Sequence, residues 1–504
     1  MIVIELTAAV DSSGTLRTFY LSTDSFTTLP TDTPANISFD PRIVDPGNIS
    51  IHAYADASTT GQAAQLQAGE ITLANADGAL DGWLNYSFDG RPLVIREGDA
   101  SDPYPGGFTE LFVGVTDSLD ATWTNMVIAI KDKQFLFDNP VLTNTYLGNN
   151  VLPNGVEGTT ADLFGQPKPQ VFGTVYQVSP KFINTSLLTY QVNDGSVVSI
   201  AAVYDRGTLL TAGTNFTTAA LLQASVPTAG TYNTCLAAGM FQLGSSPAGT
   251  VTADVVQNAA STAAQTLRSL ALAAGLSVGE ISASDVATLD ILNNAQVGIW
   301  IDGSTTFKDA MDQIAASVGA WYGFISGVLR MGILTEPSGT PKLTLHDYEF
   351  GEGIVRRAAR DKNIPVWKVT LNHTKIWTTQ TDVAGSVPAA TRAYLGLQYR
   401  SVIQFDAAVK LQYKQATELV VNTLLSNLTA ATNEASRQLS LQKKHRDFFD
   451  VPIDISLLPA TPLIYMDPIE LIVSRFGLDS GKLFRLTGIT YNLAASQVIL
   501  TLWG

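Results

Sequence analysis

Pairs of carboxylates are the residues of this chain that come nearest to a catalytic pattern. Glu97 is followed by Asp99, and Asp450 by Asp454. Two carboxyl groups that face each other across a cleft can hydrolyse a glycosidic bond. Both pairs stand in expected strands or turns, where exposed acidic side chains are ordinary. The sequence also lacks the Gly-x-Ser-x-Gly, His-Glu-x-x-His and phosphate-loop patterns. We therefore expect no catalytic residue and no enzymatic activity.

The histidines and the single cysteine do not form a metal-binding pattern. The four histidines do not have the short mutual spacing that a metal site requires, and Cys235, the sole cysteine, excludes an intrachain disulfide and a multi-cysteine centre. We expect Cys235 to be a small buried side chain. The prediction is therefore no metal-binding residue, no cofactor-binding residue and no cofactor. The histidines are His52, His346, His373 and His445.

Residues 75–82 (NADGALDG) place several oxygen-bearing side chains at short spacing. A calcium loop of the EF-hand type needs further acidic positions and a bidentate Glu about twelve residues along. No suitable Glu follows, so we interpret the segment as the end of a strand with Asp-Gly turn residues.

Trp321, Tyr322 and Phe324 form an aromatic cluster that could serve as a platform for a sugar. The cluster directly follows an expected helix whose apolar positions are Phe307, Met311, Ile314 and Val318. Because helix and cluster are adjacent in the chain, we favour core packing of the aromatic rings against that helix.

Composition limits the classes of function. The chain has 504 residues and a net charge of −15, from 45 acidic and 30 basic side chains. Without a long basic run, sequence-specific binding of nucleic acid is not expected. Residues 1–7 are typical of a strand rather than a secretory signal, and no apolar run approaches the roughly 20 residues needed to span a bilayer. We expect synthesis and assembly in a cytoplasm.

At 504 residues the chain is too long for one core, so we expect roughly three or four domains. The expected fold class is α+β, dominated by β structure and multidomain. Two β-rich regions, early and late, flank material that contains helices, and no repeat of short fixed period is found. The expected domains are an antiparallel barrel or sandwich (1–149), a β-rich accessory domain (150–250), an α+β domain (251–345) and a second β-rich domain (346–504). The resemblance described below implies that the first and last are β-barrels, which need not be continuous in sequence.

Several elements inside these domains can be placed more closely. We expect a helix over 306–318 that ends at Gly319, and a hairpin over 321–334 that turns at Ser326-Gly327. Helices are expected within 414–442, including a run that carries Ala416, Leu419 and Leu424, and closing strands over 448–504. The small-residue-rich stretch 212–249 is expected to be an elaborated loop region.

Nine segments of the chain form an ordered set of expected strands and turns. Most lie in the first half of the chain, and the hairpin stretch and the last residues complete the set. The segments are AGEITLANADGALD (68–81), FDGRPLVIREGD (88–99), FVGV (112–115), GQPKPQVFG (165–173), YQV (190–192), AVYDRG (202–207), ASVGAWYGF (316–324), RLTGITY (485–491) and LTLWG (500–504). Read in this order, they resemble tail hub proteins of siphophages and gene transfer agents.

The resemblance implies a structural role at the tip of a phage tail. Hubs of this kind are similar to the baseplate hub of contractile phages, where each chain contributes two tube-type antiparallel barrels with inserted accessory and helical domains. A homotrimer then presents six barrels, matches the sixfold tail tube to a threefold tip and lines the DNA exit channel. The implied partners are the distal tail protein or tail tube, the tape-measure protein and tail fibre or receptor-binding proteins. Genomic DNA would pass transiently, without specific binding.

Two other functions stay open at the level of sequence. One is a tail-associated glycan or peptidoglycan hydrolase, for which the carboxylate pairs are the candidates. The other is a carbohydrate-binding adhesin of the tail tip, in which Trp321 and Tyr322 or the stretch 212–249 would contact sugar. The chain stops at the hub without the long fibre of larger tip proteins, so we expect receptor binding to reside in separate proteins.

Overall fold

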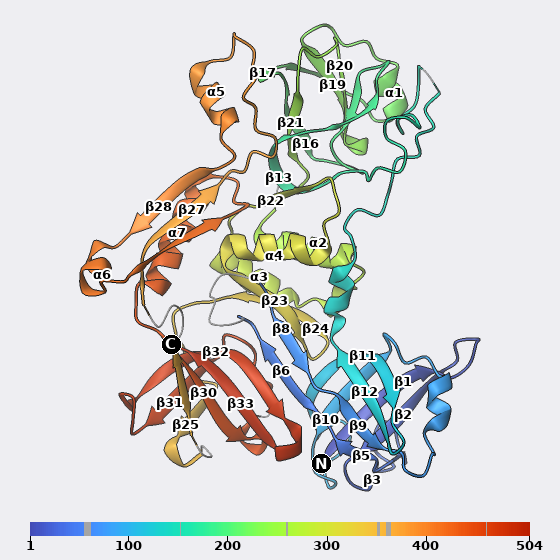
Figure 1. Ribbon diagram of the computed structural model, residues 1–504, viewed down its shortest axis with the longest axis vertical. Helices are drawn as coiled ribbons and strands as arrows, with labels where there is room; N and C mark the ends of the chain where they lie inside the picture. The colour runs from blue at the N-terminus through green and yellow to red at the C-terminus, as the bar shows by residue number, and fades with distance from the viewer. Residues whose placement is uncertain (55–61, 152, 259–260, 350–352, 359–363, 460) are drawn as a thin grey trace.

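The computed structural model describes residues 1–54, 62–151, 153–258, 261–349, 353–358, 364–459 and 461–504. The protein is mostly β and multidomain, and two curled half-barrel sheets lie side by side at one end of the molecule (Figure 1). Helices occupy the middle and a second β-rich region lies at the opposite end. Among the described residues, no helix is long and apolar enough to cross a membrane.

The first half-barrel is antiparallel throughout. Buried and partly exposed residues alternate along its strands, as in β12 (Asn125–Lys131), where Met126, Ile128 and Ile130 are buried. This period of two gives the sheet one face toward the core. In spatial order its strands are β2 (Leu16–Ser22), β1 (Ile2–Ala9), β10 (Pro92–Glu97), β11 (Thr109–Ala121), β12 (Asn125–Lys131), β9 (Ile71–Ala74) and β5 (Ile43–Asp45). A small separate sheet pairs β3 (Phe26–Thr27) with β4 (Ser38–Phe39).

The second half-barrel is built mainly from the end of the chain. Its strands are β25 (Leu343–His346), β31 (Pro468–Val473), β32 (Leu478–Asn492), β33 (Gln497–Trp503), β30 (Asp447–Asp454) and β26 (Val355–Ala358). Two strands from the early part of the chain join it, β6 (Asn48–His52) on β32 and β8 (Gln65–Ala68) on β6. Both half-barrels contribute to one hydrophobic core, which contains Ile4 and Ile71 from the first and Phe449 and Leu500 from the second.

The β-rich region at the far end contains two five-stranded sheets. The first has the order β17 (Thr208–Leu209), β16 (Ser199–Asp205), β21 (Val251–Val256), β13 (Gln170–Val178) and β22 (Gly298–Ile301). The second has the order β14 (Lys181–Asn184), β15 (Thr189–Gln191), β20 (Met240–Leu243), β19 (Thr231–Cys235) and β18 (Thr211–Asn215), next to helix α1 (Ala219–Gln223). The prediction of a loop region over 212–249 is therefore wrong, because three of these strands and α1 lie within it.

The middle of the molecule packs helices α2 (Ala263–Ala273), α3 (Ala283–Leu292) and α4 (Phe307–Val318) against a hairpin of β23 (Ala320–Ile325) and β24 (Val328–Ile333). The helix predicted over 306–318 is confirmed, with Thr306 as its cap and Gly319 in a left-handed conformation after it. The hairpin turn at Ser326-Gly327 is confirmed too, with both residues at positive φ. β7 (Gln62–Ala63) extends this small sheet beside β23.

A three-stranded sheet projects from the side of the molecule. Its order is β28 (Arg400–Phe405), β27 (Val366–His373) and β29 (Thr417–Asn422), and α7 (Leu428–Gln442) packs on one face. Two shorter helices, α5 (Ala389–Gly396) and α6 (Ala407–Gln412), lie between the strands in sequence. The helical run predicted through Ala416, Leu419 and Leu424 is wrong: β29 occupies 417–422, because its β-branched residues pair with the distant β27.

Candidate assembly joint

The two half-barrels contain the same five-stranded unit. The first has the order β10-β11-β12-β9-β5 and the second β31-β32-β33-β30-β26, with every neighbouring pair antiparallel. The strands also follow one another along the chain in the same order in both units. The two half-barrels are therefore built on two copies of one five-stranded unit.

The equivalence extends to the register of single residues. Pro92 lies opposite Val115 and Val115 opposite Lys131. In the second unit, Pro468 lies opposite Arg485 and Arg485 opposite Trp503. One β-bulge falls at the same step in both units: Asp117 is the extra residue after Thr116 in the first unit, and Thr487 is the extra residue after Leu486 in the second. Because a bulge bends a sheet locally, this shared bulge bends the two units at the same place.

The chain crosses from one unit to the other and back within a short stretch. β5 and β9 pair with each other in the first sheet, but the β6–β8 hairpin between them pairs with β32 of the second. At the crossing the backbones touch, and Gly69 N donates a hydrogen bond to Asn48 O at 2.6 Å. A Cβ on Gly47, which has φ +75°, would lie 2.9 Å from Glu70 O. Glycine is required there because a side chain would meet backbone.

Side chains fasten this hairpin to the second unit. The Tyr465 hydroxyl donates to Ile51 O at 3.1 Å, and the hydroxyls of Ser50 and Thr490 lie 2.7 Å apart. At the end of the hairpin strand, the Tyr54 hydroxyl donates to Gly319 O and accepts from Leu334 N, both at 3.0 Å. Burial raises the pKa of Tyr54 well above its ordinary value, so the hydroxyl stays protonated. One hairpin thus joins the two half-barrels to the helical middle.

An ion pair on α7 joins this helix to the end of α4 and to the segment that follows β24. The Arg437 guanidinium donates to Leu334 O at 3.0 Å and to Val318 O at 2.9 Å, and pairs with Glu434 at 2.7 Å. The Glu434 side chain is 2% exposed, against 23% for Arg437. Asn293 also donates to Glu434 at 2.8 Å. Arg437 therefore satisfies the carbonyl at the end of α4 and compensates a buried carboxylate at once.

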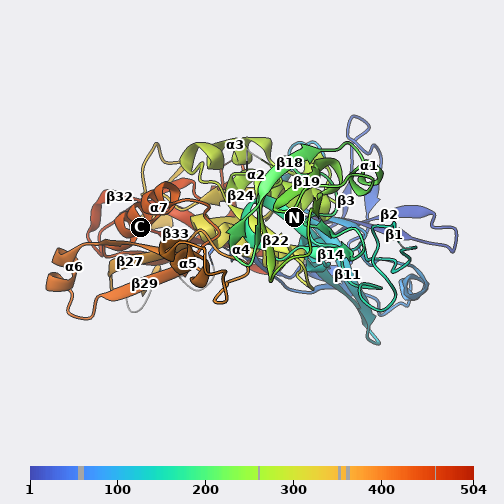
Figure 2. The ribbon, with the colours of Figure 1, turned by 90° about the horizontal axis from the view of Figure 1, so that it is seen from above.

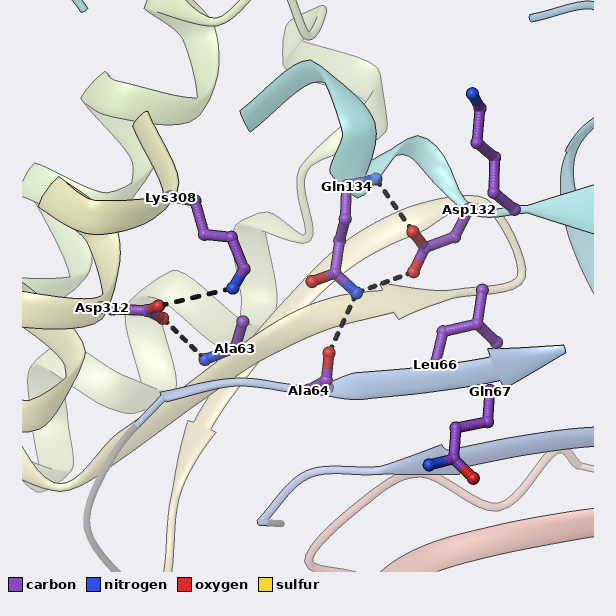
Figure 3. Close-up of a pocket in the computed structure, with 9 residues that line it drawn as sticks. Ala63, Ala64, Leu66, Gln67, Asp132, Gln134, Lys308 and Asp312 are labelled. Atoms are coloured by element: carbon purple, nitrogen blue, oxygen red, sulfur yellow. Dashed lines mark hydrogen bonds and ion pairs between the residues drawn. The ribbon is translucent and has the colours of Figure 1, made fainter. Parts of the chain in front are cut away.

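A polar pocket of about 410 Å³ lies beside β7 (Figure 3). Asp312 accepts from Ala63 N at 2.9 Å, and Gln134 Nε2 donates to Ala64 O at 3.0 Å and to Asp132 at 2.8 Å. Burial raises the pKa of Asp132 above its usual range. The polar groups around this pocket thus hold residues 63 and 64 between α4 and the turn after β12.

A second pocket, of about 640 Å³, lies at the start of α7. Its lining is rich in amides, including Asn293, Asn427 and Asn433, and it contains the Glu434–Arg437 pair. Asn427 caps α7 by accepting from Ala430 N at 2.9 Å. Asn293 and Asn427 therefore already have structural hydrogen bonds.

The carboxylate pairs proposed from the sequence are rearranged by the fold. Asp450 pairs with Arg357 and accepts from Thr501 Oγ1 at 2.9 Å. Asp454 accepts from the Ser456 hydroxyl at 2.6 Å and from Ser456 N at 2.9 Å, and these hydrogen bonds lower its pKa. Glu97 has a raised pKa, chiefly through burial, with a contribution from the negative charge of Asp454. The negative charges of both Asp99 and Asp454 therefore act on Glu97, so the fold adds a member of the second pair to the first.

The histidines stand in separate environments. His346 stacks on Tyr348, the His373 ring lies 2.8 Å from Thr374 Oγ1, and His445 lies 3.9 Å from Asp447. His52 lies on β6 in the joint. Within the described ranges, no three His, Cys, Asp or Glu side chains are grouped so that they could hold a metal ion.

Two local interpretations from the sequence are confirmed. Residues 75–82 form a turn in which Asn75 Nδ2 donates to Asp81 at 2.8 Å, while the Arg42 guanidinium binds Asp77 and lowers its pKa to about 2. Cys235 is fully buried.

The aromatic cluster is core rather than surface. Trp321 is 1% exposed and Tyr322 0%. The Tyr322 hydroxyl donates to Asp312 on α4 at 2.8 Å, and Trp321 meets Tyr465 edge to face. These rings cannot serve as a sugar platform, so that part of the adhesin hypothesis is wrong.

Sequence reasoning missed the crossing of the β6–β8 hairpin. The Pro46-Gly47 and Ala68-Gly69 steps that flank it are the signals that could have indicated it, since paired glycines mark close approaches of backbone. The reason for these glycines is that the hairpin pairs with β32, which lies more than four hundred residues further along the chain.

No family model and no curated protein matches the sequence. Among solved structures, a tail protein from Neisseria meningitidis is similar, with 10% identity and a TM-score of 0.44 over 91% of each chain. The likeness is to tail proteins. The 43 kDa tail protein of prophage MuSo2 from Shewanella oneidensis has 10% identity and a TM-score of 0.42 over 100% of this chain and 98% of that chain. A chain of a gene transfer agent virion has 13% identity and a TM-score of 0.43 over 73% of this chain and 91% of its own.

Proposed function

We propose that this protein is a virion structural protein, the trimeric hub at the distal end of a phage or gene-transfer-agent tail. In this role it adapts a sixfold tail tube to a threefold tip and lines the channel through which DNA leaves. It is not an enzyme. It is made in the host cytoplasm and assembles there with its partners, which are the tail tube or distal tail protein, the tape-measure protein and the receptor-binding proteins.

The observation that carries the proposal is the repeated five-stranded unit. A chain with two units of the same strand order and register and a shared bulge can place two near-equivalent surfaces around one axis. Three such chains present six units, so a ring with threefold symmetry offers six similar contacts to a sixfold tube. The joint between the units is fastened by a shared core and a shared hairpin, which fixes their relative orientation as an adaptor requires.

The charge of the first half-barrel suits a channel for DNA. Residues 1–149 carry 19 acidic and 6 basic side chains, a net charge of −13. Binding to nucleic acid depends on neutralising phosphates with Lys and Arg. An acidic wall repels the phosphates, so DNA passes along it without being held.

Electron microscopy of the assembled protein tests the proposal. We expect a closed ring of three chains in which six half-barrel units surround one axis, with neighbouring units related by about a sixth of a turn. Native mass spectrometry of the same sample should give three copies. A ring in which the two units of each chain lie at unrelated radii would contradict the hub function.

One specific observation favours the hydrolase alternative. Glu97 with a raised pKa and Asp454 with a lowered pKa interact electrostatically, and carboxyl groups whose pKa values are pushed apart can divide the roles of acid and nucleophile. A zymogram against host cell wall separates the two functions. We expect no clearing; clearing that is lost in Glu97→Gln but kept in Asp99→Asn would replace the hub proposal.

A further inference from the structure

The two half-barrels carry their insertions at the same place. In the first unit, the β6–β8 hairpin lies between β5 and β9. The equivalent strands of the second unit are β26 and β30, and the segment between them contains β27, β28, β29 and helices α5 to α7. We call residues 364–446 the basic insert. By position in the unit, the basic insert is the counterpart of the β6–β8 hairpin.

The hairpin shows what an insertion at this place does. β6 leaves its own unit and pairs with β32 of the next one, where Gly488 faces His52 and Tyr491 faces Ile49. This pairing covers the end of β32, so Thr487, Gly488 and Ile489 are buried. One unit thus donates its insertion to the free edge of the neighbouring unit.

The first unit has the same edge, and no strand of the described residues covers it. By the shared register, residues 118–121 of β11 correspond to 488–491 of β32. In the described part of the chain, β11 is paired on that side only as far as Thr116. Ser118, Asp120 and Ala121 are exposed, and Trp123 at the hairpin tip is 96% exposed. The edge that β6 covers in the second unit therefore has no partner strand among the described residues in the first.

The basic insert presents an apolar face that no element among the described residues covers. α7 covers one face of its sheet through Val369, Leu371 and Leu419. On the other face, cross-strand neighbours Ile403, Thr370 and Val420 form one row and Phe405, Lys368 and Glu418 the next. Ile403, Phe405 and Val420 are 50%, 62% and 61% exposed. Apolar side chains grouped in this way are typical of interaction surfaces.

Charge indicates what covers this face. Residues 364–446 contain 10 basic and 4 acidic side chains, a net charge of +6 in a chain whose total is −15. The first half-barrel region, at −13, is the complementary surface. Lys410 and Lys414 are exposed, and Lys410 lies over the ring of Trp367, which meets Phe405 of the apolar face edge to face. Opposite charges of this size steer association and fix its register.

The positions of the two surfaces fit a ring. Viewed along the long axis of the molecule, the sheet of the basic insert and the strands of the first half-barrel lie on opposite sides (Figure 2). A contact between different surfaces on opposite sides joins copies head to tail, and such contacts close into rings when the rotation permits.

We propose that the basic insert of one copy docks on the β11–β12 hairpin of a second copy, at residues 118–121. The contact places the insertion of one unit on the edge of another, as the β6–β8 hairpin does within one chain, but it uses an apolar sheet face and charge rather than strand pairing. It rests on the proposed function, since the ring that it closes is the ring of the hub.

Charge reversal on both sides tests the contact. The variants are Lys410→Glu with Lys414→Glu on the insert, Asp120→Lys on the hairpin, and all three together. The insert variant alone and the hairpin variant alone should each lower the association constant of the trimer, measured by sedimentation, on the order of tenfold or more. The combined variant should restore most of that affinity. The matched controls, Arg475→Glu and Asp479→Lys on the exposed tip of the second half-barrel, should leave it unchanged. Raising the salt from about 0.1 M to about 1 M should weaken the wild-type trimer, because the Debye length falls from about 10 to about 3 Å.

A zero-length carbodiimide cross-link, which joins an amine to a carboxylate, identifies the partners directly. In a mixture of isotopically light and heavy chains, we expect mixed-isotope links from Lys410 or Lys414 to Asp117 or Asp120. A trimer that forms normally in all the charge variants, with links elsewhere, would overturn this contact and leave the hub standing. A wild-type chain that stays monomeric, with no mixed links, overturns the contact too. The hub function itself is then decided by microscopy of the tail.

Discussion

Gly47 gives the sharpest test of the chain crossing between the two half-barrels. Its φ of +75° lies in the left-handed region, and a Cβ there would sit 2.9 Å from the carbonyl oxygen of Glu70. The left-handed conformation costs an alanine roughly 1–2 kcal/mol. Displacing backbone in a packed site adds about 1–3 kcal/mol. Gly47→Ala should therefore lower the free energy of unfolding by about 2–5 kcal/mol.

Gly90 is the matched control in the same half-barrel. It has φ +67°, but nothing lies within 4 Å of the Cβ that alanine would add. Gly90→Ala should therefore show the conformational cost alone, about 1–2 kcal/mol. The difference between the two variants measures the close approach of the crossing strands.

The assay combines urea unfolding with hydrogen exchange. In Gly47→Ala we expect faster exchange in two regions that are distant in sequence, residues 48–52 and 488–492, since these strands pair with each other. Gly90→Ala should leave both regions protected. If the two variants lose the same free energy, or if exchange rises in 48–52 but not in 488–492, the hairpin is not held as described.

Three further predictions concern the core. Arg437→Met should cost about 3–5 kcal/mol by leaving the Glu434 carboxylate buried and unpaired, and adding Glu434→Gln should recover part of this; a double-mutant cycle by thermal unfolding measures the coupling. Burial raises the pKa of Asp254 above 3.8, so the folded state binds this proton more tightly and stability falls as the pH rises from that value through the raised pKa. Asp254→Asn should flatten the dependence of Tm on pH over that range. An unchanged slope would contradict the raised pKa of Asp254. Trp321→Ala should cost about 3–5 kcal/mol as a core truncation, whereas loss of binding to host cells at unchanged Tm would favour a sugar site.

Elements with local signals could be predicted from the sequence. The α4 helix has its cap at Thr306 and its stop at Gly319, and the following hairpin has the Ser326-Gly327 turn. Each signal acts within a few residues, so no knowledge of the rest of the fold is needed. The mostly β character followed from alternating strands and turn residues in the same way.

Elements decided by distant partners could not be predicted. The apolar residues of β29 fit helical spacing by coincidence, and their strand conformation depends on parallel pairing with β27, about fifty residues away. The strands within 212–249 pair with β15 and with each other. Small residues such as those in this stretch give weak propensities, so tertiary contacts decide their conformation.

The repeat of the half-barrel unit was hidden for a different reason. At equivalent positions of the two units, Pro92 and Pro468 are identical, whereas Val115 in the first unit corresponds to Arg485 in the second, and Lys131 corresponds to Trp503. The backbone pairing and the shared bulge are preserved while the side chains differ. The repeated unit is therefore visible in strand pairing and register but not in an alignment of the two amino-acid sequences.

The crossing of the β6–β8 hairpin sets the order in which the chain can fold. Ser50 is made early in synthesis, but its partner Thr490 follows 440 residues later. Domains usually fold as they emerge from the ribosome, yet the first half-barrel cannot complete its joint until almost the whole polypeptide has been made. During that interval the hairpin exposes strand edges that can pair wrongly. The two half-barrels thus mature together, and a chain interrupted before β32 leaves the first one unfinished.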